Sequence, residues 1–368
     1  MIDQGPDAGP APAPPPSVYA SEEYLVSLLA KAVAARASDI HLKVGQPPGA
    51  RVGGEIVYFR ADPLKPEDTR VLASHILRER DETARARLDT LLEHDTAYSA
   101  RGVGRFRVNI YRQRGSIAIV MRAIPFVIPT LEELGAPAAC ELLAEKERGL
   151  VLVVGAAGNG KSSTLAAMIG HLNRTRALHI VTVEDPIEYL HRDDKASVSQ
   201  REVGIDTASF PDALRAALRQ DPDVVLVGEI RDETTMEIAL KAAETGHLVL
   251  STLHTPGVSR TVNRMLSLAR GQPGDEMRER IGDALQGIVA QRLVPRKDGT
   301  GVVLAAEVLV ATGTVRESLK RPEGNPSLKE LMEKGAHPYG MQTFEMAIKQ
   351  LVAQGIVEKE AGKVAAAF

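Results

Sequence analysis

The second half of the chain alternates between strand-like and helix-like spacing of hydrophobic residues. Residues 150–154 form an uninterrupted apolar run, which is typical of a strand buried on both faces. Further strands are expected at 178–183, 196–200, 223–227, 247–252, 288–294 and 302–308, with helices at 209–220, 232–245 and 341–352. This alternation predicts an α/β fold, with a mainly parallel sheet flanked by helices and ligands at the carboxyl ends of the strands.

The first half has a different spacing of hydrophobic residues, which predicts a smaller α+β domain. Apolar residues at helical spacing between 25 and 33 lead into the alternating stretch 40–44, and turns separate it from 55–59. Two charged helices are expected between 64 and 92, followed by a β-hairpin within 101–122. Residues 5–16 hold six prolines, so we expect a disordered tail at 1–18. Prolines 125 and 129 mark a linker at 125–134, which leaves domains at 19–124 and 135–368.

The stretch directly after the apolar run 150–154 has the layout of a phosphate-binding loop. It comprises Gly155, Ala156, Ala157, Gly158, Asn159, Gly160, Lys161, Ser162 and Ser163. Its glycines allow tight turns that point backbone N–H groups at an anion, Lys161 adds a positive charge, and Ser162 offers an oxygen to Mg²⁺. A simple glycine turn between strand and helix is the plain alternative. The strand before the loop and the helix after it favour binding of a nucleoside triphosphate.

Three later strands end in polar residues that should meet beside this loop. Glu229 follows 224–227 at the position where a carboxylate holds Mg²⁺ or its water, and Glu184 is the candidate to deprotonate an attacking water. The division of roles between the two acids stays open. His254 lies where a donor could sense the outermost phosphate, whereas His247, at a strand start, could equally be packing. His171, His179 and His191 are expected to be structural.

The hairpin within 101–122 is rich in arginine. Its arginines are residues 101, 105, 107, 112, 114 and 122, and it contains no acid. Such a face suggests an anionic partner, such as a phosphate, nucleic acid or lipid head group. The alternative is a solvated face whose arginines pair with acids elsewhere in the fold.

Net charge, the length of the apolar runs and the cysteine count exclude some kinds of partner and site. A net charge of −3 argues against bulk nucleic-acid binding, and no apolar run is long enough to span a bilayer. The single cysteine, Cys140, excludes an intramolecular disulfide and any CxxC zinc site, so we expect a reducing, cytoplasmic setting.

Several motifs in one order resemble the type II/IV secretion ATPase superfamily, and within it the PilT/PilU retraction ATPases of type IV pili. They are 37–42 (Ala-Ser-Asp-Ile-His-Leu), the loop 155–164, 183–189 (Val-Glu-Asp-Pro-Ile-Glu-Tyr), 200–204, 213–232, 245–255 and 340–344. The resemblance implies a PAS-like N-terminal domain and a RecA-like P-loop ATPase domain with C-terminal helices. It also implies a ring-shaped homohexamer that hydrolyses ATP with Mg²⁺.

The resemblance further implies roles for single residues. By position, 155–163 is Walker A, Glu184 the catalytic base in an Asp box, Glu229 the Walker B acid, and His247 with His254 a His box. Arg107 and Arg122 match arginines that reach the nucleotide, which supplies the hairpin with an anion other than nucleic acid. The implied partners are an inner-membrane pilus platform protein resembling PilC and a paralogous retraction ATPase. The implied location is the cytoplasmic side of the inner membrane.

Three departures from the family pattern bear on function. Ala156 and Ala157 replace Pro-Thr, and Asn159 replaces a small residue, yet the backbone cradle should survive. The retraction signature expected near 315–319 is only faint, which leaves an accessory, PilU-like role as the alternative to the main motor. The zinc-binding CxxC pair of the extension ATPases is absent from the sequence.

Overall fold

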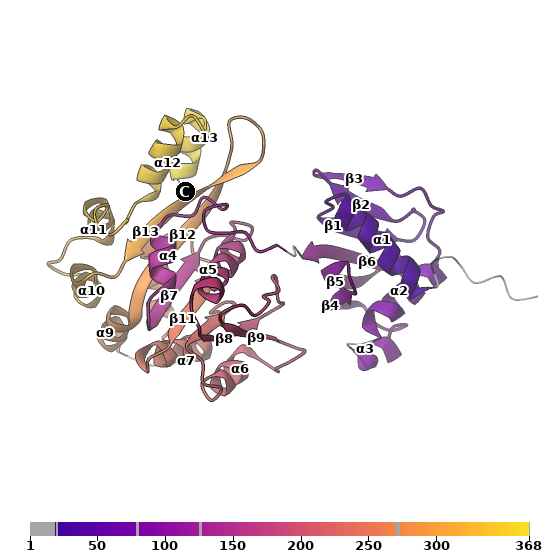
Figure 1. Ribbon diagram of the computed structural model, residues 1–368, viewed down its shortest axis with the longest axis horizontal. Helices are drawn as coiled ribbons and strands as arrows, with labels where there is room; N and C mark the ends of the chain where they lie inside the picture. Colours follow the sequence, from indigo (N-terminus) through magenta and orange to yellow (C-terminus); the bar gives the residue numbers. More distant parts are fainter. Residues whose placement is uncertain (1–18, 20, 79–80, 125–126, 270–272, 368) are drawn as a thin grey trace, which may run out of the picture. The chain divides into compact units, whose positions relative to one another are not determined.

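A computed structural model of the chain describes residues 19, 21–78, 81–124, 127–269 and 273–367. The chain forms two compact units, divided between residues 126 and 127 (Figure 1). The expected tail at 1–18 and the first two residues of the expected linker lie outside the described residues. Within the described ranges, no helix is both long and apolar enough to cross a lipid bilayer.

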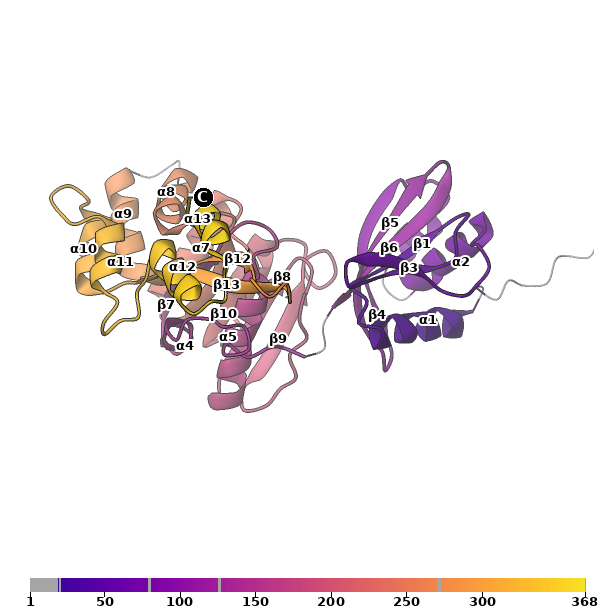
Figure 2. The ribbon, with the colours of Figure 1, turned by 90° about the horizontal axis from the view of Figure 1, so that it is seen from above.

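The first unit is a six-stranded antiparallel sheet in the order β3-β2-β1-β6-β5-β4, with α1 and α2 packed on one face (Figures 1 and 2). Its elements are α1 (Glu22–Ala34), β1 (Asp39–Lys43), β2 (Gly49–Val52), β3 (Glu55–Tyr58), α2 (Pro66–Leu77), α3 (Glu82–Ala86), β4 (Glu93–Ala100), β5 (Gly104–Gln113) and β6 (Ser116–Ile124). Side chains alternate along a strand, so Ile40, Phe106 and Met121 face the helices and are fully buried. The opposite face carries Asp39, Arg107 and Arg122.

Two strands of this sheet were not expected from the sequence. β2 lies in a glycine- and proline-rich stretch for which the sequence predicts turns, and its pairing with β1 decides its conformation. β4 reads Glu-His-Asp-Thr-Ala-Tyr-Ser-Ala, a polar pattern that becomes a strand by pairing with β5 along its whole length. The second of the two expected charged helices is also short, because α3 ends at Ala86.

The second unit is built on a seven-stranded sheet in the order β13-β12-β7-β11-β10-β8-β9. All its neighbouring strands run parallel except β12 and β13. Its strands are β7 (Gly149–Val154), β8 (His179–Glu184), β9 (Ser197–Glu202), β10 (Val224–Val227), β11 (Leu248–Leu253), β12 (Leu285–Pro295) and β13 (Val302–Val310). Its helices are α4 (Ala139–Ala144), α5 (Lys161–Thr175), α6 (Phe210–Ala217), α7 (Glu233–Glu244), α8 (Val258–Leu268), α9 (Gly274–Ala284), α10 (Gly313–Lys320), α11 (Leu328–Lys334), α12 (Phe344–Ala353) and α13 (Lys359–Ala367).

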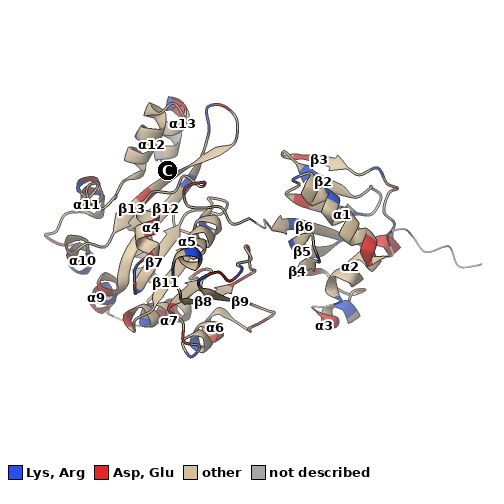
Figure 3. Ribbon diagram, in the orientation of Figure 1, with Lys and Arg blue, Asp and Glu red and all other residues tan. Residues whose placement is uncertain are grey.

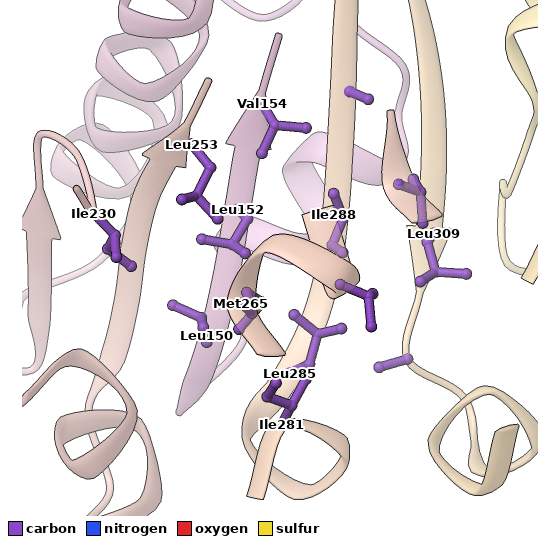
Figure 4. Close-up of a cluster of buried hydrophobic side chains, with 14 of the residues drawn as sticks. Leu150, Leu152, Val154, Ile230, Leu253, Met265, Ile281, Leu285, Ile288 and Leu309 are labelled. Atoms are coloured by element: carbon purple, nitrogen blue, oxygen red, sulfur yellow. The ribbon is translucent and has the colours of Figure 1, made fainter. Parts of the chain in front are cut away.

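Helices cover both faces of this sheet. α4 and α5 lie on one side and α7, α8 and α9 on the other (Figure 2). Successive residues of β7 point to opposite faces of the sheet. Leu150, Leu152 and Val154 pack on the α7–α9 side with Met265 and Ile281 (Figure 4). Val151 and Val153 pack on the α5 side. This alternation explains why β7 reads as one unbroken apolar run.

The parallel strands bring four chain segments together at one edge of the sheet. Val154 pairs with Leu253, and Val227 pairs with both Val183 and Ser251. The residues that follow these strands therefore lie side by side, as expected for ligand sites in open parallel sheets. Elsewhere the surface mixes charges, and α9, α10 and α11 each carry both signs (Figure 3).

Candidate active site

The phosphate-binding loop follows β7 and ends where α5 begins. Its glycines adopt positive φ angles, +150° at Gly155, +80° at Gly158 and +78° at Gly160, a region that side chains disfavour. A Cβ on Gly155 would lie 2.7 Å from the backbone oxygen of Gln291 in β12, so the loop packs too tightly there for any other residue. Ala156, Ala157 and Gly158 are exposed at the rim of the loop. An anion can thus reach the N-terminus of α5.

Lys161 is the first residue of α5, and its side chain folds back over the loop. Its Nζ donates a hydrogen bond to the backbone oxygen of Ala156 at 3.0 Å. Burial lowers the pKa of Lys161, while the nearby carboxylates of Glu229 and Glu188 oppose that shift. Ser162 follows in the first turn of the helix. The ammonium group of Lys161 is thus close enough to the loop to bind a phosphate oxygen in place of the Ala156 carbonyl.

Two neighbouring contacts hold the loop from the side of β12. The Gln291 side chain, 1% exposed, donates to Thr164 Oγ1 at 2.7 Å, and Asn159 Oδ1 accepts from the Leu293 N–H at 3.3 Å. Asn159 therefore ties the loop to β12, a role that its place in the motif did not reveal. On the other side of α5, the hydroxyls of Ser163 and Tyr189 lie 2.8 Å apart.

Glu184 ends β8 and is held by three hydrogen bonds. Thr182 Oγ1 and Gln200 Nε2 donate to its Oε1, at 2.7 and 3.2 Å, and the Glu188 N–H donates to its Oε2 at 3.4 Å. Burial raises the pKa of Glu184, and the bonds from Thr182 and Gln200 partly offset that effect. A fixed carboxylate with a raised pKa is suited to accept a proton.

Glu229 lies beside it, one residue beyond Gly228. A Cβ on Gly228 would lie 3.2 Å from the backbone oxygen of Val183, so glycine permits the close approach of the two strand ends. Hydroxyls from β11 fix this segment, because Ser251 Oγ donates to the oxygen of Val227 and Thr252 Oγ1 to that of Gly228, both at 2.7 Å. Because its flanking backbone is anchored, Glu229 holds a defined position.

A set of ionisable side chains, here named the Glu229 cluster, comprises Glu229, Arg231, Asp185 and His254. Arg231 forms an ion pair with Glu229 Oε1, and its Nη1 lies 3.9 Å from Asp185 Oδ2. His254 Nε2 lies 3.4 Å from Glu229 Oε2. The hydrogen bond to Glu229 raises the pKa of Arg231. The cluster joins the segments that follow β8, β10 and β11.

The structure separates the two histidines of the expected His box. His254 follows the end of β11, whereas His247 precedes its start, roughly 20 Å away along the strand. His247 Nδ1 lies 3.1 Å from the backbone oxygen of Ala242 in α7 and packs there. This contact supports the packing alternative for His247, and its place in the His box stays a prediction.

Another histidine has acidic neighbours that the sequence did not reveal. The two ring nitrogens of His171 face different carboxylates, with Nδ1 3.6 Å from Glu141 and Nε2 3.0 Å from Glu145. These contacts link the end of α4 to α5.

In the first unit, Arg107 and Arg122 face each other across β5 and β6, and both side chains are exposed. Arg122 also pairs with the facing residue of β1, since its Nε lies 2.9 Å from Asp39 Oδ1. Burial by itself would raise the pKa of Asp39, but hydrogen bonds from Ser38 and Arg122 bring it below its usual value. One of the two arginines thus has an acidic partner within the unit.

The hairpin does not present all its arginines on one open face. Arg105 is only 7% exposed. Arg112 donates to the backbone oxygens of Leu88, Leu91 and Gly115, and also to that of Asp89. Its guanidinium therefore holds the segment after α3 against the hairpin. Arg105 and Arg112 therefore do not lie on an open face for an anion, because long side chains fold back onto the chain that they cover.

Sequence reasoning missed three residues of the site: Gln200, Arg231 and Gln291. Gln200 and Arg231 stand inside motifs that were recognised, but their roles depend on the pairing of β9 with β8 and on the turn after β10. Gln291 lies in a strand far along the chain, and no local signal indicates its contact with α5.

The oxygen donors beside the loop fit a divalent cation. Mg²⁺ prefers carboxylate and hydroxyl oxygens together with phosphates. Glu229 supplies a carboxylate held in place by its neighbours, 14% exposed, and Ser162 supplies a hydroxyl at the helix start.

Comparisons with known proteins agree with this architecture. The family described as Type II/IV secretion system protein matches residues 19–365. The type IV pilus retraction ATPase PilT of Pseudomonas aeruginosa is 40% identical over 336 residues, which cover 91% of this chain and 96% of that protein. The type IV pilus ATPase PilU of the same organism is 42% identical over 325 residues, 88% of this chain and 83% of that one.

A solved structure extends the likeness to three dimensions. The crystal structure of the pilus retraction motor PilT with bound ADP superposes with a TM-score of 0.84 at 41% identity, and it covers 93% of this chain and 96% of that one. Sequence motifs, fold and site thus lead to one conclusion: the chain belongs to the type II/IV secretion system protein family.

Proposed function

We propose that this protein is an ATP-hydrolysing motor that powers the retraction of a type IV pilus, and hence twitching motility. One observation carries the proposal: a phosphate-binding loop and two strand-end carboxylates, Glu184 and Glu229, share one edge of the sheet. The likeness to PilT over nearly the whole chain indicates which kind of work the ATPase performs.

ATP binding uses the loop after β7. The N–H groups between Gly155 and Ser163 receive the phosphates, since they lie at the N-terminus of α5. Lys161 exchanges its bond to the oxygen of Ala156 for one to an outer phosphate. Ser162 and Glu229 would hold Mg²⁺, which would neutralise charge on the phosphates.

Hydrolysis needs a base and groups that stabilise developing charge. Glu184 accepts the proton of the attacking water, because its pKa is raised and its carboxylate is held by Thr182 and Gln200. His254, directly after β11, donates to the outermost phosphate. Arg107 and Arg122 from the N-terminal, PAS-like domain supply further positive charge to the transferring phosphoryl group.

The motor works as a homohexameric ring in the cytoplasm, at the inner membrane. Its domains, 19–124 and the RecA-like 135–368, move relative to each other during the ATP cycle. Its partners are a pilus platform protein and a paralogous retraction ATPase, and nucleic acid is not a partner. An accessory role is the second candidate, favoured by the 42% identity to PilU and by the faint retraction signature.

Phosphate release from the purified chain tests the enzymatic part. Lys161→Ala and Glu229→Gln should both abolish turnover, whereas Lys241→Ala, at an exposed position of α7, should match the parent. Negligible turnover by the parent would refute the motor and favour a nucleotide-binding docking subunit. Single-stranded DNA should neither bind nor stimulate; stimulation would favour a helicase.

A deletion strain tests the cellular part. Long, unretracted pili that the wild-type gene shortens again would identify a main retraction motor. Normal pili with weak surface motility would identify an accessory subunit. Complementation with the Glu229→Gln variant separates the need for hydrolysis from the need for the protein itself.

A further inference from the structure

Arg231 is a charged residue of the ATP site that the proposed mechanism does not use. It pairs with Glu229 Oε1 and also lies 3.9 Å from Asp185 Oδ2. His254 Nε2 approaches the other oxygen of Glu229 at 3.4 Å. Both oxygens of the carboxylate assigned to Mg²⁺ thus already face a basic side chain of the protein.

The backbone on each side of Arg231 is anchored. Ile230 is 3% exposed, and its N–H donates to the backbone oxygen of Thr252 at 3.0 Å. Asp232 caps α7, accepting from the N–H and the hydroxyl of Thr235 at 2.8 and 3.0 Å. The Arg231 side chain itself remains 61% exposed. Its guanidinium can therefore leave Glu229 by side-chain rotation, with the backbone in place.

A guanidinium and a divalent cation cannot share one carboxylate oxygen at full strength. Mg²⁺ binds oxygen at about 2.0–2.1 Å, and its charge repels a neighbouring cation. Arg231 on Oε1 therefore competes with the metal for the Glu229 carboxylate. Asp185, on the segment after β8, offers the released guanidinium a second acidic partner.

We propose that Arg231 is a positioning residue that occupies Glu229 before nucleotide arrives and competes with Mg²⁺ for its carboxylate. It thereby sets the Mg²⁺ concentration at which the site holds nucleotide together with the metal. The inference rests on the proposed ATP site. Two other roles make different predictions: an exposed ion pair of little consequence, and a direct contact from Arg231 to ATP.

The test measures nucleotide binding, with no turnover required. A fluorescent ATP analogue is titrated into the full chain at a series of free Mg²⁺ concentrations, and Mn²⁺ binding with ADP present is followed by electron paramagnetic resonance. The variants are Arg231→Gln and Arg231→Lys. The matched control is Arg215→Gln, which breaks an ion pair of α6 between Arg215 Nη1 and Asp212 Oδ1 at 3.2 Å, with a similar side-chain exposure of 54%.

Competition predicts that Arg231→Gln lowers the Mg²⁺ midpoint by about two- to fivefold, the range expected for losing one such ion pair. Affinity without Mg²⁺ should stay unchanged, Arg231→Lys should lie near the parent, and Arg215→Gln should match it. In a Glu229→Gln background, Arg231→Gln should have no further effect, because the carboxylate under competition is gone.

Two results would overturn the inference. An unchanged midpoint would make Arg231 a surface ion pair, and a raised midpoint or a loss of Mg²⁺-free affinity would mean that Arg231 assists the metal or contacts ATP. Failure of the parent chain to bind ATP under any condition would instead refute the proposed function.

Discussion

Substitution of Gly155, the first glycine of the phosphate-binding loop, should weaken ATP binding by an amount that the packing around it indicates. In Gly155→Ala the new Cβ would lie 2.7 Å from the backbone oxygen of Gln291, closer than side-chain atoms approach. The backbone at φ +150° is also a conformation that L residues rarely adopt, at a cost of about 1–3 kcal/mol. Gln291 lies within β12 and pairs with Ala306 of β13, so its backbone is held in place. The loop must therefore move away from β12.

A displaced loop no longer aims its N–H groups at one point, so ATP binding should weaken about 10- to 100-fold, equivalent to about 1.4–2.8 kcal/mol. Titration with a fluorescent ATP analogue measures the loss, and thermal unfolding measures the strain. The control is Gly246→Ala, with φ +112° but nothing within 4 Å of the new Cβ. It should lower the unfolding temperature and leave ATP affinity unchanged. Parent-like binding by Gly155→Ala would refute the packing argument.

Contacts of Gln200, His191 and Arg280 can each be tested by one substitution. Gln200→Leu removes the hydrogen bond that Gln200 Nε2 donates to Glu184 at 3.2 Å, which should raise the pKa of Glu184. Turnover should therefore fall about tenfold, and the acid limb of the pH–rate profile should move to higher pH. An unmoved limb would exclude this hydrogen bond from catalysis. Burial lowers the pKa of His191 to about 4, so its contribution to stability is complete above about pH 6.5 and falls as pH drops towards 4, by up to about 1.4 kcal/mol per pH unit. Urea unfolding at pH 7 and 5 should therefore show a smaller difference for His191→Phe than for the parent, and equal differences would contradict the assignment. Arg280→Ala breaks 2.8 Å ion pairs to Glu237 and Glu244 that join α9 to α7, and calorimetry should register a loss of about 1–2 kcal/mol with ATP affinity retained.

Local patterns in the sequence were enough to predict much of the second unit. The apolar run at 150–154, the glycine loop and the alternation that follows correspond to β7, the loop before α5 and the strands β8 to β13. These signals are local, because a buried parallel strand and a helix each impose their own spacing on neighbouring residues. The acids after β8 and β10 could be proposed as a site because parallel strands bring their carboxyl ends to one edge.

Local patterns failed where pairing or distant contacts decide the conformation. The polar stretch 93–100 has no strand signature, and β4 exists because β5 offers it a partner. Arg112 looked like a free cation of the hairpin, although its guanidinium meets backbone oxygens of residues more than twenty positions earlier.

By itself, the sequence determined the chemistry that can occur: a phosphate loop, two carboxylates and a histidine at strand ends. The tertiary structure alone decided how those groups are held. Gln200 reaches Glu184 through the pairing of β9 with β8, Arg231 reaches Glu229 across a turn, and Gln291 supports the loop from β12. The reason is physical: periodicity records which face of an element is buried, whereas hydrogen bonds and ion pairs depend on distances that only the packed chain defines.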